Sequence, residues 1–156
     1  MSTAGYRLDA SQRELPFPAT HHVRDTCLCL HVQRAARALA RRFDEALRPV
    51  DLTQGQFSLL TSLNRPEPPN VGSVAALLAM DRTTLTANLK PLERRGLVKI
   101  AVDKQDKRAR RLMITSAGRT LLRKAFPIWQ KTHAEVEKSL TGISADALRA
   151  ALQALA

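Results

Sequence analysis

Apolar side chains recur every three or four residues along several stretches of the chain, the spacing that places them on one face of an α-helix. The first stripe begins near Asp25 and consists of Leu28, Val32, Ala35, Leu39, Phe43, Ala46 and Val50. Proline cannot donate a backbone hydrogen bond, so we expect this helix to end at Pro49. Residues 1–22 show no such period and contain two prolines, which predicts an irregular N-terminal arm.

A second helix is predicted in the stretch LTQGQFSLLTSL, residues 52–63. Thr53 and Gln56 have the spacing of a capping box, which satisfies free N–H groups at a helix start. Phe57, Leu60 and Leu63 give this helix an apolar face. The proline-rich sequence NRPEPPN that follows predicts a loop.

Two further helices are predicted with almost no linker between them. Ser73 is placed to cap a short helix over residues 74–80, and Asp81 to cap a second helix over residues 82–95, which Gly96 ends. Such a pair, with a second helix rich in Thr, Asn and Lys, is typical of a helix-turn-helix.

The apolar period then changes from helix to strand. The runs LVKIAV and RLMIT flank the charged stretch DKQDKRARR, residues 103–111, and together they predict a β-hairpin with a long loop. Thr115 or Ser116 is expected to cap a long helix with an apolar seam, and Ser144 to start a last helix.

This order predicts a mainly α fold, a winged helix-turn-helix with flanking N- and C-terminal dimerisation helices. Residues 53–114 would form the DNA-binding lobe, and residues 23–52 and 115–156 a helical dimerisation region. The flanking stripes exceed what the small winged core can cover, so we expect a homodimer in which these helices interlock.

Composition and charge restrict the partners. Formal net charge is +11, and between Arg82 and Lys124 there are 13 Lys/Arg against three Asp/Glu, a local charge of +10. Such charge predicts an anionic partner, which could be nucleic acid, an acidic membrane or an acidic protein. Together with the helix-turn-helix, it makes double-stranded DNA the expected partner. The longest apolar run, residues 74–80, is far shorter than the ~20 residues of a membrane span. We therefore expect a cytoplasmic protein with no membrane partner.

The second helix of the pair has the short polar side chains that a major-groove reader needs near its N-terminus. The candidate DNA contacts are Arg82, Thr83, Thr84, Thr86, Asn88 and Lys90. The alternative is an ordinary surface helix with threonine caps, which the hairpin directly after Gly96 makes less attractive.

The charged stretch is expected to form the wing tip. We hypothesise that Arg108 enters the DNA minor groove, where a narrow groove concentrates negative potential, and that Asp106 pairs with Arg108 and fixes its direction. Phosphates would be neutralised by Lys104, Lys107, Arg110 and Arg111. The alternative is a solvated run of charges.

At this point the motifs resemble those of the multiple antibiotic resistance regulator (MarR) family. The matching segments are DRTTLT at Asp81–Thr86, LERRGLV at Leu92–Val98, DKR at Asp106–Arg108 and TSAG at Thr115–Gly118. The resemblance implies dimeric DNA-binding repressors that act on palindromic sites and are often released by small phenolic ligands or by cysteine oxidation. Many members have Arg where this chain has Ala87, so base readout would shift to Thr86, Asn88 or Lys90.

The only two cysteines, Cys27 and Cys29, lie in the sequence CLCLH. Three interpretations stay open: small buried side chains, a redox switch, or a soft-metal site formed by Cys27 with His31 and His21 or His22. The resemblance also implies a pocket for a small aromatic effector, for which Cys29, Gln33, Phe57 and Trp129 are candidates by position.

Two function classes compete. The first is a sequence-specific transcriptional regulator, and the second is a low-specificity architectural DNA-binding protein, since phosphate contacts give affinity without specificity. An enzyme is not expected, because the sequence shows no nucleophile–base set, no phosphate-binding glycine loop and no zinc-spaced cluster beyond the Cys/His group. No cofactor is expected either.

Overall fold

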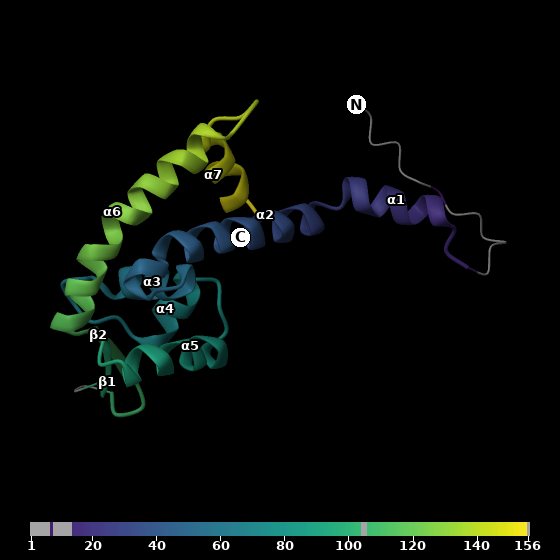
Figure 1. Cartoon of the computed structure of the whole chain (residues 1–156). Coiled ribbons are helices and arrows are strands. Elements are labelled where there is room, and N and C mark those ends of the chain that lie inside the picture. Colours follow the sequence, from purple (N-terminus) through teal and green to yellow (C-terminus); the bar gives the residue numbers. More distant parts are fainter. Residues whose placement is uncertain (1–6, 8–13, 104–105, 156) are drawn as a thin grey trace. The chain divides into compact units, whose positions relative to one another are not determined.

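The computed structural model describes residue 7, residues 14–103 and residues 106–155 (Figure 1). The chain divides into two compact units, residues 1–39 and residues 40–156, with the boundary inside a helix. The elements are α1 (Phe17–Thr26), α2 (Leu28–Leu47), the 3-10 helix η1 (Arg48–Val50), α3 (Gln54–Leu63), α4 (Val71–Leu77), α5 (Arg82–Arg94), β1 (Val98–Val102), β2 (Arg110–Ile114), α6 (Ser116–Lys138) and α7 (Ala145–Gln153). The prediction of a mainly helical fold with a two-stranded wing is confirmed.

The N-terminal prediction differs from the structure in two respects. A helix, α1, already begins at Phe17, within the segment expected to be irregular, and α2 begins at Leu28 rather than near Asp25. Pro18 lies in the first turn of α1, where its missing N–H would have no helical partner and its fixed φ suits the helix. Cys27 is extended, with φ −70° and ψ 105°, and this residue separates the two helices.

Side-chain caps set the starts of the middle helices. Thr53 and Gln56 form the predicted capping box of α3. The cap of α4 is Asn70, whose Oδ1 accepts from the Ser73 N–H at 2.8 Å, so the prediction of a Ser73 cap is wrong. Asn70 has the extended conformation of a cap residue, and α4 therefore starts three residues earlier.

Helices α4 and α5 form the helix-turn-helix. Ala79 in the turn has φ 49°, a left-handed conformation that costs a non-glycine residue roughly 1 kcal/mol. Asp81 caps α5, and Leu85, Leu89 and Leu92 turn inward and are almost completely buried. The opposite side of α5 remains exposed.

The wing is an antiparallel pair in the register Val98↔Ile114, Ile100↔Leu112 and Val102↔Arg110. Val98, Leu112 and Ile114 are buried and join the core, so the wing is anchored by one face. Figure 1 shows the hairpin directly beside α5.

Gly118 fixes the junction between the wing and α6. Thr115 caps α6 by accepting from the Gly118 N–H at 3.1 Å. A Cβ atom at Gly118 would lie 2.3 Å from the Leu97 carbonyl oxygen, so only glycine fits without a shift of backbone. The glycine of the TSAG segment therefore allows α6 to start against the chain that enters β1.

One core joins α3, α4, α5, the wing and the first half of α6. Its fully buried leucines include Leu47, Leu60, Leu63, Leu85, Leu92 and Leu112. Large apolar side chains outside it remain exposed: Leu28, Val32 and Leu39 on α2, Ile143 before α7, Leu152 in α7 and Leu155 after it. Within the described ranges, no helix is both long and apolar enough to cross a membrane.

Candidate nucleic-acid interface

The N-terminus of α5 is held by its cap. Asp81 accepts from the Thr84 N–H at 2.8 Å and from the Thr84 hydroxyl at 2.6 Å. These hydrogen bonds, the side-chain one first, hold the pKa of Asp81 below its ordinary value of 3.8. The Thr84 hydroxyl thus donates its hydrogen to the cap residue, and its oxygen can still accept a hydrogen bond from another group.

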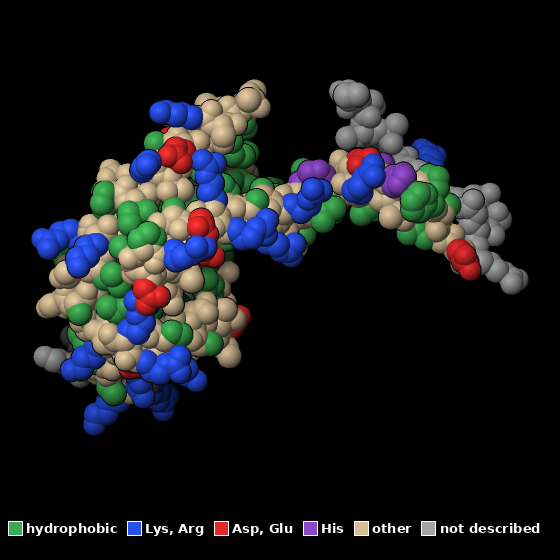
Figure 2. All heavy atoms as spheres, in the orientation of Figure 1, with side chains coloured by type: hydrophobic (Ala, Val, Ile, Leu, Met, Phe, Trp, Pro, Cys, Tyr) green, Lys and Arg blue, Asp and Glu red, His purple; other side chains and the backbone are tan. Residues whose placement is uncertain are grey.

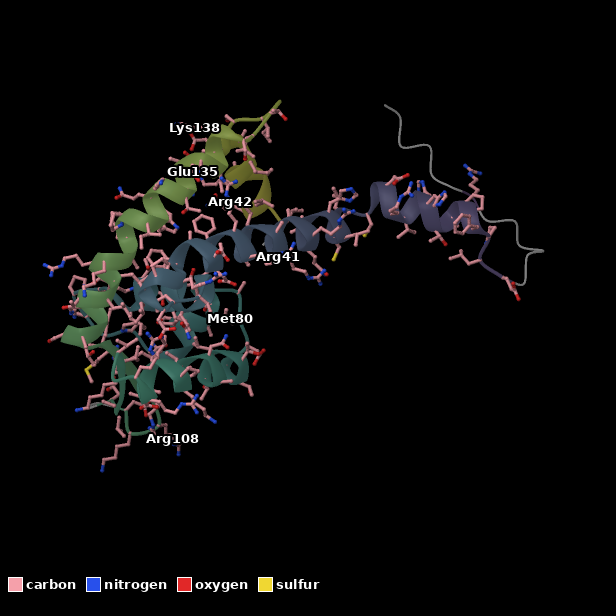
Figure 3. The ribbon with its side chains drawn as sticks, in the orientation of Figure 1. Arg41, Arg42, Met80, Arg108, Glu135 and Lys138 are labelled. Atoms are coloured by element: carbon pink, nitrogen blue, oxygen red, sulfur yellow. The ribbon has the colours of Figure 1, made fainter. Side chains whose placement is uncertain are left out.

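The other predicted side chains of α5 lie on its exposed face. Arg82, Thr83, Thr86, Asn88 and Lys90 are all exposed. The Thr86 hydroxyl donates to the Arg82 carbonyl at 2.7 Å, and Asn88 Nδ2 lies 3.8 Å from the sulfur of Met80, the residue labelled in Figure 3. Leu85 and Leu89 occupy the opposite face.

A groove of about 560 Å³ joins α5, the start of α4 and the wing loop. It is lined by Asn70, Val71, Gly72, Arg82, Thr86, Asp106, Arg108, Ala109 and Arg110. Gly72 lets the Arg82 guanidinium approach α4, because a Cβ there would lie 3.3 Å from Arg82 Nη2. Arg82 of α5 and Arg108 and Arg110 of the wing thus line the same groove. Sequence reasoning missed Asn70 and Gly72, although the Asn-x-Gly spacing next to the proline loop was visible.

The wing loop is shaped by Asp106, in a different way from the one predicted. Its Oδ1 accepts from the backbone N–H of Arg108 at 2.9 Å, whereas the prediction paired it with the Arg108 guanidinium. Asp106 therefore fixes the backbone from which Arg108 projects at the wing tip (Figure 3). Lys107 and Arg108 are exposed. Lys104, also predicted as a phosphate contact, lies outside the described residues.

Arg110 and Arg111 have different surroundings. Arg110 is exposed, and its Nη1 donates to the carbonyls of Lys107 and Ala109 in its own loop, at 3.0 and 3.3 Å. Arg111 forms an ion pair through Nε with Asp103, whose side chain is only 7% exposed. The structure thus brings Arg110, but not Arg111, to the groove.

Positive charge gathers around this interface. Figure 2 shows Lys and Arg side chains clustered at the end of the molecule formed by the wing and α5. The acids near it, Asp81 and Asp106, are engaged in hydrogen bonds to helix and loop N–H groups. The exposed charge is therefore mainly cationic, as an interface with phosphates needs.

The cysteines are free thiols and neither is buried in the chain: Cys27 is half-buried and Cys29 is exposed. Cys29 Sγ accepts from Gln33 Nε2 at 3.2 Å, and His31 Nδ1 lies 2.9 Å from the Cys27 carbonyl oxygen. In the part of the chain that the structure describes, no group of three or more His, Cys, Asp or Glu side chains could hold a metal ion.

The proposed pocket residues are divided between the two compact units. Phe57 and Trp129 stack with ring centroids 6.0 Å apart, whereas Gln33 belongs to the other compact unit and contacts Cys29 and Arg37. Trp129 also stacks on Phe126 and on His133, with ring centroids 5.8 and 4.8 Å apart. The i, i+3 and i+4 spacing of these aromatic residues on α6 could have revealed this stack from sequence.

Comparisons with known proteins match this architecture. The MarR family model matches residues 52–109, which span α3 to the wing loop. The HTH-type transcriptional regulator TtmR of Methylorubrum extorquens is 33% identical over 132 residues, which cover 85% of this chain and 65% of TtmR. The chain therefore spans just under two thirds of that relative's length.

Solved structures extend the match to most of the chain. The transcriptional regulator MosR of M. tuberculosis, in complex with DNA, is 37% identical with a TM-score of 0.76, covering 83% of this chain and 92% of MosR. The transcriptional repressor CouR of Rhodococcus jostii, bound to a 23-mer DNA duplex, is 29% identical with a TM-score of 0.69, covering 85% of this chain and 92% of CouR.

Proposed function

Because this chain belongs to the MarR family, a family of transcriptional regulators rather than enzymes, we propose that it is a sequence-specific DNA-binding repressor that acts as a homodimer. The observation that carries the proposal is the groove in which Arg82 of α5 meets Arg108 and Arg110 of the wing. MosR and CouR, two relatives of the same fold, were solved with DNA.

The proposed contacts divide by role. Thr83, Thr86, Asn88 and Lys90 lie on the exposed face of α5, where a helix in the major groove presents its side chains to base edges. Arg82, Lys107 and Arg110 would neutralise phosphates, and Arg108 would enter the minor groove. Lys104 is proposed as a further phosphate contact from its sequence position alone.

A homodimer would give the exposed apolar side chains a partner. Val32 and Leu39 are 38% and 42% exposed on α2, and Leu152 and Leu155 are 42% and 66% exposed at the C-terminal end. Covering apolar area is the main driving force of association, and a two-fold dimer would present two recognition helices to two half-sites. The proposal of a palindromic operator follows from this symmetry.

The test is selection of bound fragments from a random duplex DNA pool at ~150 mM salt, where binding to phosphates alone is weak. We expect an enriched inverted repeat with half-sites about one helical turn apart. Binding that is labile to salt and enriches no motif would contradict sequence-specific regulation. It would favour the alternative, an architectural DNA-binding protein, which the same basic groove would also serve.

Release from DNA by thiol oxidation is a second part of the proposal. Cys29 is exposed and Cys27 half-buried, so an oxidant can reach the pair. Oxidant should weaken DNA binding by the wild-type protein and leave the double variant Cys27→Ser, Cys29→Ser unaffected. An unchanged oxidant response in this variant would remove the thiols from the mechanism.

Release by a small aromatic effector is the other proposed route. Its support is the stack between Phe57 of the winged lobe and Trp129 of α6. A thermal-shift measurement with a panel of aromatic acids should find at least one compound that stabilises the protein, because a ligand bound only to the folded state raises the unfolding temperature. The same compound should fail to shift a Trp129→Ala variant.

A further inference from the structure

An ion pair closes the base of the wing loop. Asp103 follows β1 and Arg111 lies in β2, and the Asp103 carboxylate pairs with Arg111 Nε. The other carboxylate oxygen accepts from the Asp106 N–H at 3.1 Å, and the Asp103 N–H donates to the Ala109 carbonyl at 3.0 Å. Asp103 thereby ties both sides of the loop from which Arg108 projects.

Arg111 also connects the wing to the chain that precedes α4. Its Nη1 donates to the Pro68 carbonyl at 3.1 Å, and the neighbouring Leu112 N–H donates to the Pro69 carbonyl at 2.9 Å. A β-bridge between Asn70 and Arg111 continues the contact. Asn70 caps α4 and lines the basic groove, so Arg111 links the wing to the opposite wall of that groove.

These partners argue against a phosphate role for Arg111. To reach DNA, the guanidinium would have to leave a carboxylate that is 7% exposed and a backbone carbonyl. Removing the guanidinium from a largely buried carboxylate costs the attraction between the two charges, and water replaces it poorly there. Arg110 needs no such exchange, since its acceptors are carbonyls of its own exposed loop.

We propose that Arg111 is a positioning residue, which with Asp103 holds the wing loop and hence Arg108 at the groove, and does not itself neutralise a phosphate. This inference rests on the proposed DNA-binding function.

Two variants distinguish a positioning role of Arg111 from a direct contribution of its charge to DNA binding. Arg111→Lys keeps the positive charge, and lysine binds phosphate as a point charge, but lysine lacks the planar fork that reaches Asp103 and Pro68 together. Asp103→Asn removes a negative charge near DNA, which electrostatics alone predicts to tighten binding. The matched controls are Arg123→Lys, the same substitution at an exposed position of α6 outside the basic groove, and Glu67→Gln, which removes another acid beside the same pair.

The dissociation constant is measured by fluorescence anisotropy on a duplex recovered by the selection described above. Asp103 is largely buried, and the Arg111 side chain is 42% exposed. We expect Arg111→Lys and Asp103→Asn each to weaken binding by roughly tenfold, as loss of one partner of a partly buried charge pair does, and both controls to stay within about twofold of the wild type. Wild-type affinity of Arg111→Lys, or tighter binding by Asp103→Asn, would overturn the proposal.

Two further readouts exclude a loss of folding. In an Arg108→Ala background, Arg111→Lys should cost little, because the two substitutions remove the same contact, whereas global destabilisation or an independent phosphate contact would give additive losses. In the free protein, amide hydrogen exchange at Asp103 and Leu112 should be faster in Arg111→Lys than in the control Arg123→Lys. If the wild type enriches no DNA, the proposed function fails. The exchange measurement still tests whether Arg111 and Asp103 hold the wing loop.

Discussion

Neighbouring residues of the same type have different roles in the wing. Arg110 and Arg111 are consecutive in β2, and successive side chains of a strand point to opposite faces. Arg110 therefore lines the basic groove with Arg82 and Arg108, while Arg111 turns to Asp103 and Pro68. The charge pattern alone gave Arg110 and Arg111 the same role, the neutralisation of phosphates.

Arg108 should contribute most to DNA affinity among the wing residues. It is exposed at the tip, on backbone fixed by Asp106, with no acid pairing its guanidinium in the described contacts. Arg108→Ala should weaken binding by roughly 1–3 kcal/mol and reduce the salt dependence of log K. Lys138→Ala, which removes an exposed charge at the end of α6, is the control and should have little effect. Near-wild-type affinity of Arg108→Ala, measured by salt titration, would exclude its role.

Gly118 should be intolerant of any side chain. Its missing Cβ allows the Leu97 carbonyl to approach, and the Cβ of an alanine would lie 2.3 Å from that carbonyl oxygen, so Gly118→Ala should destabilise the fold by roughly 1–3 kcal/mol. Gly55→Ala is the matched control: Gly55 lies in α3 with no atom within 4 Å of the added Cβ, and the change should be neutral or stabilise by up to about 1 kcal/mol. Urea unfolding measures the stability of both variants. Equal midpoints would show that the junction between the wing and α6 can shift to make room for the added methyl group.

At the scale of elements, caps decide where the DNA-binding helices begin. Asn70, Asp81 and Thr115 each accept a hydrogen bond from the third residue of the helix they start. The Asp81 cap is the one that carries a charge, and the N-terminal end of a helix stabilises an anion. The start of α5 is therefore sensitive to pH.

The folded-state pKa of Asp81 lies below 3.8, so its ionised form contributes stability above the unfolded-state pKa, and this contribution is lost as pH falls through the folded-state value. Asp81→Asn keeps an acceptor for the Thr84 N–H but cannot ionise. The unfolding temperature of the wild type should therefore exceed that of Asp81→Asn at pH 7, and the difference should shrink on acidification towards pH 3. If the difference in unfolding temperature does not change with pH, the charge of Asp81 is not its cause, and the geometry of the cap would explain it.

At the scale of the whole molecule, the winged lobe buries its apolar side chains in its own core, but the flanking helices leave several of theirs exposed. Leu28, Val32 and Leu39 stay exposed on α2, as do Leu152 and Leu155 at the C-terminal end. Large apolar side chains left exposed on regular helices support the proposed homodimer interface.

Leu39→Glu should shift the protein from dimer to monomer in sedimentation, because it places a charge in the proposed apolar interface. DNA affinity should fall with it, since one recognition helix would then act alone. Arg41→Glu is the control: two residues along α2 place it about 200° away on the polar face, and it should remain dimeric despite a larger change in charge. If Leu39→Glu remains dimeric, Leu39 does not lie in the dimer interface.

The local signals of the sequence determined most of the elements. Apolar periodicity, the Thr53–Gln56 capping box, the Asp81 and Thr115 caps and the strand pair around the charged loop all depend on residues close in sequence, so they could be predicted. The start of α1 at Phe17 and the Asn70 cap were missed because proline and asparagine suit both loops and helix starts, and local pattern does not choose between them.

Only the tertiary structure decided the roles within the basic segment. Asp103, Pro68 and Arg111 meet because the loop before α4 pairs with β2 across 43 residues of sequence, and no local pattern encodes such a contact. The same holds for the approach of Arg82 to Gly72 and of Gly118 to Leu97. The sequence therefore determined that this chain carries a winged helix-turn-helix with a focused positive charge. Which cations face the groove and which hold the wing was decided by long-range packing, because a side chain's role depends on the partners that folding brings within reach.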